Sequence, residues 1–262
     1  MTTNAQTLNV LVTGASRGIG RAIACALAGR GARIAVHYQG NLRGAGETLA
    51  ALAGTGHALF AANLADPSAS ARLWRDVVEK FGRIDVLINN AGIYDMHPPL
   101  STDYALWHEV WERTLATNLL APANLSLLAA QAMAAGTAPR ANGWGRGRIV
   151  NISSRGAFRG EPDAPAYGAS KAGLNSLSQS LAKALAPCGV YVYCLAPGWV
   201  ATDMATAHIT GPGGAEVLAQ HPLGRVATPE EIAEAAVFCA LDAPAVMTGA
   251  IIDLNGATYL RT

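Results

Sequence analysis

The sequence predicts an α/β protein in which a doubly wound parallel sheet of seven strands is covered by helices on both faces. Short β-rich runs alternate with helical segments along the whole chain, and a glycine-rich turn joins the first run to the first helical segment. The run at residues 84–92 is almost wholly apolar, as expected for a strand that is buried on both faces. Because such alternation builds βαβ units into one sheet and no domain boundary is visible, we expect a single domain over residues 1–262.

The first half of the chain is expected to contribute four strands and three helices. The strands are residues 8–13, 33–38, 57–64 and 84–92, and the helices are residues 19–31, 41–54 and 67–82. A glycine ends the first helix, internal glycines weaken the second, and Pro67 occupies the first turn of the third.

The second half begins with a long helix that ends at about Gly136. Further strands are expected at residues 147–154, 190–198 and 249–256, and further helices at residues 165–187 and 228–242. The helix at residues 165–187 carries one stripe of leucines. Thr228 and Glu231 form a capping box at the start of the helix at residues 228–242. Two segments rich in glycine and proline, residues 136–147 and 204–224, are expected to be loops, and loops of this length are often functional.

The composition argues against several classes of protein. Apolar residues make up 51% of the chain and charged residues 14%, so a large core is expected, with apolar surface left for subunit contacts. A formal net charge of +1 gives no reason to expect a nucleic-acid or membrane-surface partner. The most apolar window, residues 119–136, contains Pro122 and several polar residues, so it predicts a buried helix and not a membrane span. Without a secretory signal pattern, a cytoplasmic protein is expected.

Cysteines and histidines form no metal-binding pattern, and no metal is expected. The cysteines are expected to be small core residues in a reducing cytoplasm; they are Cys25, Cys188, Cys194 and Cys239. Among six histidines, only His97 is a candidate for the substrate entrance, although a histidine in a loop is more often inert.

The turn after the first strand reads TGASRGIG, with glycines at Gly14, Gly18 and Gly20. Glycine permits a tight backbone there and lets main-chain N–H groups approach a pyrophosphate, while the following helix adds its dipole. A strand before the turn and a helix after it supply the context that a dinucleotide-binding site requires.

Six features in order, taken together, resemble the short-chain dehydrogenase/reductase family. They are TGASRGIG, NNAG at residues 89–92, Asn118, the serine pair at 153–154, Tyr167 with Lys171, and PGWVATDM at residues 197–204. The resemblance covers essentially the whole chain. It implies a Rossmann-like fold, a nicotinamide cofactor and a homo-oligomer, either a tetramer or a dimer.

The resemblance also implies which residues contact the cofactor. They are Gly14, Ser16, Arg17, Gly18, Ile19, Gly20, Tyr38, Asn63, Leu64, Asn90, Ala91, Gly92, Tyr167, Lys171, Pro197, Gly198, Val200 and Thr202. Family members that use NAD commonly carry an acidic residue at the place of Tyr38, and no acidic residue occurs between Gly31 and Glu47. Arg17, with Arg43 as a possible second cation, is placed for a 2′-phosphate, so we expect NADP(H). Asn63 replaces the usual aspartate near the adenine and can still accept its hydrogen bond.

Tyr167 and Lys171 stand one helical turn apart and share a face. A ketone that receives a hydride becomes an alkoxide and needs an acid, and a nearby ammonium lowers the pKa of a phenol. We therefore expect Lys171 to lower the pKa of Tyr167 and Tyr167 to donate the proton. The resemblance adds that Lys171 hydrogen-bonds the nicotinamide ribose.

Ser154 lies thirteen residues before Tyr167, the separation that the family shows, and is expected to hold the substrate oxygen. Ser153 is the competing assignment, since neighbours in a strand point to opposite faces. The family's asparagine, matched by Asn118, holds a water in a proton relay towards the lysine.

The substrate is expected to lie among residues 94–99, 157–165 and 204–224, which supply a mostly apolar wall of Tyr94, Met96, His97, Phe158, Met204 and Ile209. Arg155 and Arg159 lie close by and are candidates to meet an anion. The segment HPLGRVATPEEIA resembles the 3-oxoacyl-acyl-carrier-protein reductases, but Cys188 stands where that subgroup often has arginine, and residues 136–147 form an unlike insertion. The expected activity is reduction of a 3-oxoacyl thioester or similar ketone; alternatives are an alcohol dehydrogenase and a non-catalytic cofactor-binding regulator.

Overall fold

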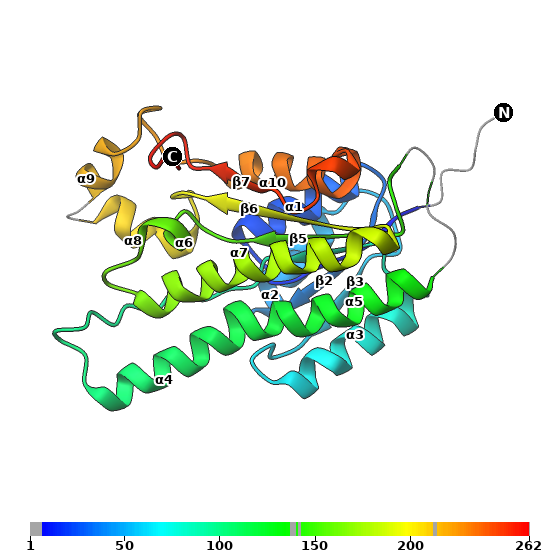
Figure 1. The fold of residues 1–262 in the computed structure, drawn as a ribbon, viewed down its shortest axis with the longest axis horizontal. Helices are drawn as coiled ribbons and strands as arrows, with labels where there is room; N and C mark the ends of the chain where they lie inside the picture. The colour runs from blue at the N-terminus through cyan, green and yellow to red at the C-terminus, as the bar shows by residue number, and fades with distance from the viewer. Residues whose placement is uncertain (1–6, 137–139, 141–142, 212–213, 262) are drawn as a thin grey trace.

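The computed structural model describes residues 7–136, 140, 143–211 and 214–261. Its centre is one parallel sheet of seven strands in the order β3-β2-β1-β4-β5-β6-β7, which confirms the predicted fold class (Figure 1). The strands are β1 (Asn9–Val12), β2 (Arg33–Tyr38), β3 (Ala58–Ala61), β4 (Val86–Asn89), β5 (Gly147–Ile152), β6 (Val190–Pro197) and β7 (Ile251–Leu254).

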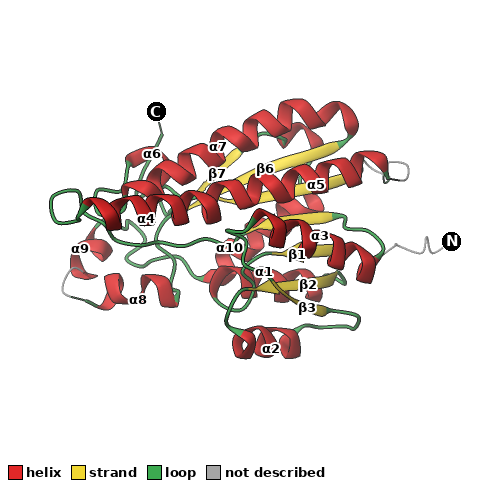
Figure 2. Ribbon diagram, turned by 90° about the horizontal axis from the view of Figure 1, so that it is seen from below, coloured by secondary structure: helices red, strands yellow, loops and turns green. Residues whose placement is uncertain are grey.

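Helices cover both faces of this sheet (Figure 2). They are α1 (Gly18–Gly29), α2 (Leu42–Ala51), α3 (Pro67–Phe81), α4 (Tyr104–Leu115), α5 (Ala121–Ala135), α6 (Gly156–Arg159), α7 (Pro165–Leu185), α8 (Asp203–Thr210), α9 (Gly214–Ala219) and α10 (Pro229–Val237). Apolar side chains of α1, α2 and α10 pack against one face, and those of α3, α5 and α7 pack against the other.

Alternation along the strands divides the core into these two layers. In β1, Val10 and Val12 belong to the layer of α1 and α10, whereas Leu11 between them belongs to the layer of α3 and α5. All three side chains are fully buried. A strand with both faces covered has no polar face to show, which explains its continuous apolar sequence.

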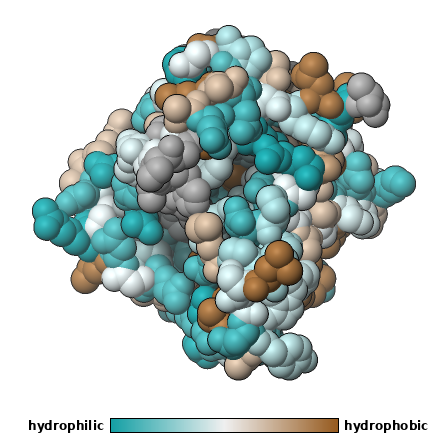
Figure 3. All heavy atoms as spheres, turned by 90° about the vertical axis from the view of Figure 1, so that its left-hand side faces the viewer, coloured by the Kyte–Doolittle hydropathy of each residue, from teal (hydrophilic) through white to brown (hydrophobic). Residues whose placement is uncertain are grey.

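The strand order reverses direction between β1 and β4, which are direct neighbours. In sheets of this kind the crevice outside the carboxyl ends of the strands, at such a switch point, is where ligands bind. The short helices α6, α8 and α9 lie at this end of the molecule (Figure 1). Hydrophilic side chains cover most of the visible surface there, with hydrophobic ones scattered among them (Figure 3).

Several details differ from the sequence-based expectations. Residues 204–224 are not simply a loop, because most of α8 and all of α9 lie within them. Cys188 is exposed and not a core residue, since it lies where α7 gives way to β6. Residues 137–139 and 141–142 of the expected 136–147 loop lie outside the described residues. The capping box of Thr228 and Glu231 is confirmed.

Two buried histidines, neither predicted to be structural, hold segments that line the crevice. His37 on β2 accepts a hydrogen bond at Nδ1 from the Gly14 amide (3.1 Å), and its Nε2 lies 3.1 Å from the Ala62 carbonyl oxygen and donates to it. The imidazole therefore joins the glycine turn to the end of β3 in its neutral form. Burial lowers the pKa of His37 to about 4.

His97 was a candidate for the substrate entrance, but its side chain is buried and caps α7. Its Nδ1 donates to the Asp95 carbonyl oxygen (2.8 Å), and its Nε2 accepts from the Ala166 amide (3.2 Å). The Ala166 amide is in the first turn of α7, where no side chain from the helix's own N-cap supplies an acceptor. A residue 69 positions before Ala166 thus fixes the start of the helix that carries Tyr167.

We expect His97→Ala to lower the free energy of unfolding by about 1–3 kcal/mol, because it removes a cap and leaves a buried amide without an acceptor. Urea denaturation measures the change. His108→Ala on the exposed surface of α4 is the control and should stay within about 0.5 kcal/mol of the parent. Equal effects of both substitutions would contradict the capping role.

We also expect stability to fall on acidification because of His37. Its folded pKa lies below its unfolded value near 6.5, so between about pH 6.5 and pH 4 the unfolded chain binds the extra proton and unfolding becomes more favourable as pH falls. The full effect is about 3 kcal/mol. Denaturation curves at several pH values should show a flatter dependence for His37→Gln than for the parent, and His108→Gln should keep the parental slope.

Candidate active site

A cavity of about 590 Å³ opens at the switch point and brings most of the predicted site residues together. Its walls contain Gly14, Ser16, Arg17, Gly18, Ile19, Gly20, Tyr38, Leu64, Asn90, Ala91, Gly92, Ser154, Tyr167, Lys171, Pro197, Gly198, Val200 and Thr202. Two predicted residues do not line it. Asn118 lies behind the wall, and Asn63 is exposed, with its side-chain oxygen accepting from the Ala65 amide (3.1 Å).

The glycine turn lies against the end of β4 with no room for larger residues. Gly14 has a φ of 63°, and a Cβ there would lie 2.9 Å from the Ala91 Cα. A Cβ on Gly20 would collide with the Gly14 carbonyl oxygen and with the Asn90 side chain. Asn90 donates to the Thr13 and Gly14 carbonyl oxygens (2.9 and 3.1 Å), so NNAG holds the turn in place as well as lining the cavity.

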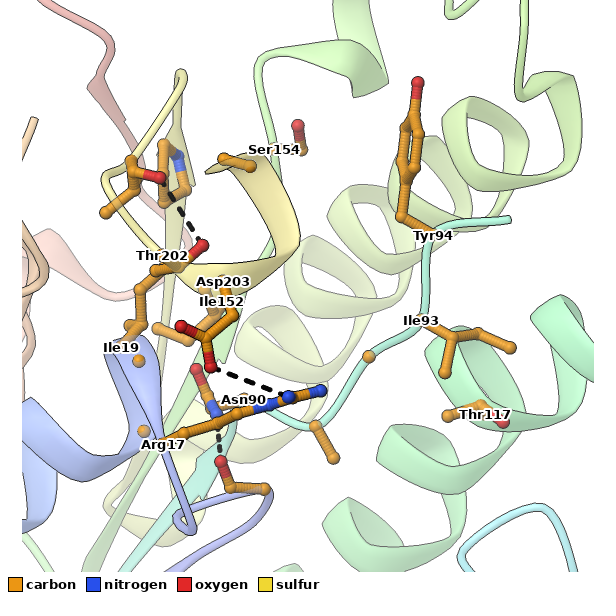
Figure 4. A pocket seen from close by; sticks show the side chains of 18 of the residues that line it. Arg17, Ile19, Asn90, Ile93, Tyr94, Thr117, Ile152, Ser154, Thr202 and Asp203 are labelled. Atoms are coloured by element: carbon orange, nitrogen blue, oxygen red, sulfur yellow. Dashed lines mark hydrogen bonds and ion pairs between the residues drawn. The ribbon is translucent and has the colours of Figure 1, made fainter. Parts of the chain in front are cut away.

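The start of α1 faces the cavity without a side-chain cap. Its N-cap residue, Arg17, makes no capping hydrogen bond, and no acidic residue stands in its first turn. Unpaired amides at a helix N-terminus attract anions, and phosphate in particular. Arg17 itself points towards Asp203 at the start of α8, with 3.6 Å between the charged atoms (Figure 4). Because both side chains are largely exposed, this pair contributes little, and Arg17 can exchange Asp203 for another anion.

The wall beyond β2 carries no carboxylate. It consists of Tyr38, Gln39, Gly40 and Asn41, and the Asn41 side chain caps α2 by accepting from the Gly44 amide (2.9 Å). Arg43, considered as a second cation, pairs instead with Glu47 (3.1 Å). The absence of an acidic side chain from this wall suits a ribose that carries a 2′-phosphate.

Tyr167 and Lys171 lie one turn apart on α7, as predicted. Lys171 is 4% exposed, donates to the Ile152 carbonyl oxygen (2.8 Å), and has its Nζ 5.7 Å from the centre of the Tyr167 ring. The Tyr94 ring meets the Tyr167 ring edge-on, with 5.0 Å between their centroids. Tyr167 is therefore packed between an ammonium and a second tyrosine, and part of its surface faces the cavity.

The expected lowering of the Tyr167 pKa by Lys171 is not found within the polypeptide. Burial raises the pKa of Tyr167 to about 12, and the Glu161 carboxylate adds to the rise; only a hydrogen bond with Ser154 lowers it. Burial also lowers the pKa of Lys171 to about 8, which weakens the ammonium as a source of positive charge. The loss of hydration is the largest cause of both pKa shifts, and it is not visible in the sequence.

The geometry favours Ser154 over Ser153 as the serine that faces Tyr167. The Ser153 hydroxyl donates to the main-chain carbonyl of Lys171 (3.3 Å) and so points into α7. The Ser154 hydroxyl accepts from the Gly156 amide (3.0 Å) and is within hydrogen-bonding reach of Tyr167. Ser154 therefore has a fixed oxygen beside the phenol.

Asn118 lies on a single π-helical turn, Ala116–Leu120, between α4 and α5. Its side chain donates to the Ile93 carbonyl oxygen and accepts from the Ile93 amide, both at 2.9 Å, and it also contacts Ser170 on α7 (3.2 Å). It therefore clamps the segment after NNAG to the Tyr-Lys helix. Turns of this kind are frequent at functional sites, but the amide itself is already engaged with protein.

The predicted substrate wall is only partly correct. Tyr94 lines the cavity, whereas Met96 is largely exposed and Phe158 stacks on Tyr259 near the C-terminus. The side chains of Met204 and Ile209 lie outside the described residues. The cavity wall is more polar than the expected apolar wall, because Glu161 lines it. Of the two arginines considered for an anion, Arg155 lines the cavity and Arg159 does not.

These residues fit a nicotinamide dinucleotide. The uncapped start of α1 and the tight turn at Gly14 and Gly20 suit a pyrophosphate, because main-chain N–H groups without side chains in the way can approach it closely. Among the described residues, only the Ile152 carbonyl accepts from the Lys171 ammonium, so further N–H groups can reach a ribose.

Similarity to known proteins extends over nearly the whole chain. The family model described as Enoyl-(Acyl carrier protein) reductase matches residues 14–257. The chain is 37% identical over 253 residues to 3-oxoacyl-acyl-carrier-protein reductase FabG of Escherichia coli, covering 95% of this chain and 96% of that protein. It is 35% identical over 259 residues to the FabG of Staphylococcus aureus, covering 97% and 99%.

Two solved structures are also similar. One is described as a short-chain alcohol dehydrogenase from Sinorhizobium meliloti, with a TM-score of 0.84 and 35% identity over 96% of both chains. The other is described as an NAD(P)-dependent gluconate 5-dehydrogenase from Beutenbergia cavernae with bound NADP, with a TM-score of 0.82 and 36% identity over 96% of both chains. Because these matches extend far beyond the glycine turn, the chain belongs to the short-chain dehydrogenase/reductase family of oxidoreductases.

Proposed function

We propose that this protein is an NADP(H)-dependent reductase that converts a ketone, such as a 3-oxoacyl thioester or a similar carbonyl compound, to a secondary alcohol. The observation that carries the proposal is the meeting of Ser154, Tyr167 and Lys171 in the same cavity as an uncapped phosphate-binding turn. The FabG relatives are 3-oxoacyl-acyl-carrier-protein reductases, which supports the reductive direction.

NADPH would supply the hydride to the carbonyl carbon. As the substrate oxygen becomes an alkoxide, Tyr167 donates the phenolic proton to it, and the Ser154 hydroxyl donates a hydrogen bond that holds it. Lys171, fixed by the Ile152 carbonyl, orients the ribose and carries positive charge next to the phenol. Asn118 holds the segment at Ile93 in a fixed position relative to α7, through its hydrogen bonds with Ile93 and Ser170.

The oxidative direction is the second candidate. Both solved relatives are described as dehydrogenases, and the same groups would run the reaction backwards, with Tyr167 accepting the proton. A cofactor-binding regulator is a weaker alternative, because it would not need the complete set of catalytic groups. We also propose a cytoplasmic homo-oligomer, a tetramer or a dimer, built from this single domain. No helix among the described residues is long and apolar enough to span a membrane.

The Tyr167→Phe variant should lose turnover by about 10²–10⁴-fold, because it keeps the packing but removes the proton donor. Its affinity for NADPH should change little, as measured by quenching of protein fluorescence. Tyr104→Phe on α4, whose ring is exposed, is the matched control and should keep parental activity. Near-parental activity of Tyr167→Phe would exclude the phenol as the acid.

NADPH should be used at least tenfold more efficiently than NADH, and Arg17→Gln should reduce this preference by about tenfold, because a charge-assisted pair with the 2′-phosphate is lost. Steady-state kcat/KM with each cofactor measures both effects. Arg72→Gln removes an exposed arginine of α3 that pairs with the N-cap residue Asp66, and it should leave the preference for NADPH over NADH unchanged. Equal use of NADH by the parent would contradict the cofactor assignment.

A further inference from the structure

Arg155 places a buried guanidinium in the wall of the cavity, directly after Ser154. Its main-chain amide donates to the Pro197 carbonyl oxygen (2.8 Å), so its backbone is fixed between the ends of β5 and β6. The residue is 4% exposed and lines the cavity together with Glu161 and Tyr167. The catalytic role proposed above does not use this charge.

The guanidinium has no ion-pair partner among the described residues. Its Nη1 is buried and has no hydrogen-bond acceptor within that part of the chain. Burial and the like charge of Arg159 both lower the pKa of Arg155, and only Glu161 acts in the opposite sense. A buried charge without a hydrogen-bonding partner costs free energy, and buried groups with shifted pKa values cluster at sites that bind a ligand.

Arg148 shows how this protein accommodates a buried arginine that is structural. It is 2% exposed, yet its guanidinium donates to the main-chain carbonyls of Cys239 (2.9 Å) and Trp144 (3.4 Å) and packs over the Trp144 and Tyr193 rings. Arg155 has no comparable set of acceptors or aromatic contacts among the described residues. The difference argues that the partner of Arg155 is not part of the polypeptide.

The guanidinium lies on the substrate side of the cavity. Glu161 influences the titration of Arg155, Tyr167 and Tyr94 alike, so all three lie near one carboxylate. Ser154, which holds the substrate oxygen in the proposed reaction, is the residue adjacent to Arg155. An anion bound there would be a second anchor for a molecule whose ketone lies between Ser154 and Tyr167.

We propose that Arg155 binds a carboxylate of the substrate, so that the preferred substrates are short oxo acids and their hydroxy acid counterparts. This inference rests on the proposed function, whose ketone it narrows to a class. A carboxylate offers two coplanar oxygens that match the donor fork of a guanidinium. A 3-oxoacyl thioester is uncharged next to its ketone and would leave Arg155 without a partner. The two anchors would fix both the position and the orientation of the carbonyl group.

The kinetic test compares each oxo acid with its own methyl ester, using NADPH and the full chain. The probes are 3-oxobutanoate and 4-oxopentanoate. We expect the parent to have a kcat/KM at least about tenfold higher for one of the acids than for its ester, and Arg155→Met to lower that acid-to-ester ratio by about 10–100-fold. Arg75→Met, which removes an exposed arginine of α3, is the control and should keep the parental ratio. A parental ratio of one or less, or an unchanged ratio in Arg155→Met, would overturn the proposal.

A binding measurement separates this proposal from the proposed function. Calorimetric titration of 3-hydroxybutanoate and 4-hydroxypentanoate, in the presence of NADPH so that no hydride transfer can follow, should show binding to the parent that weakens at least tenfold in Arg155→Met. Binding through Arg155 without reduction of any ketone would support the subsite and refute the reductase. Reduction of neutral ketones or thioesters, without binding of either hydroxy acid, would refute the subsite and leave the reductase standing.

Discussion

The close approach of the glycine turn to the end of β4 is the constraint on which the site depends. A Cβ on Gly14 would collide with Ala91, and Asn90 occupies the space that a side chain on Gly20 would need. The Thr13 hydroxyl accepts from the Asn90 and Ala91 amides (2.9 and 3.0 Å) and thereby joins the two strand ends. Because β1 and β4 are neighbours only through the doubly wound topology, the phosphate-binding turn exists in this form only in the complete sheet.

The second requirement is a fixed start of α7, and distant residues meet it. His97 caps the first turn, and Asn118 contacts Ser170 on the same helix. Deeper in the protein, Asn89 donates to Asn151 (2.8 Å), which in turn donates to Ser178 on α7 (2.8 Å). These buried polar contacts connect β4, β5 and α7, so the phenol is held by structure on several sides and not by its own helix alone.

The fold and most of the cavity wall could be predicted from the sequence because both follow from local signals. Apolar runs, glycine turns and the Thr228 cap are properties of neighbouring residues. His37 and His97 could not be assigned, since each acts on a backbone amide that the fold brings to it from another segment. The position of Asn63 outside the cavity wall has a local reason, because its side-chain oxygen accepts a hydrogen bond from the Ala65 amide in its own turn.

Arg155 illustrates the same limit for charge. The sequence shows that Arg155 follows Ser154. It does not show that the Arg155 Nη1 is buried without a hydrogen-bond acceptor, whereas the Arg148 guanidinium, seven residues earlier, has main-chain acceptors. The same burial raises the pKa of Tyr167 and lowers that of Lys171. Positive charge near the phenol favours its ionised form, and the Glu161 carboxylate opposes it. In the proposed reaction, a Tyr167 pKa raised by burial and by Glu161 keeps the phenol protonated until the alkoxide forms, as an acid in reduction requires.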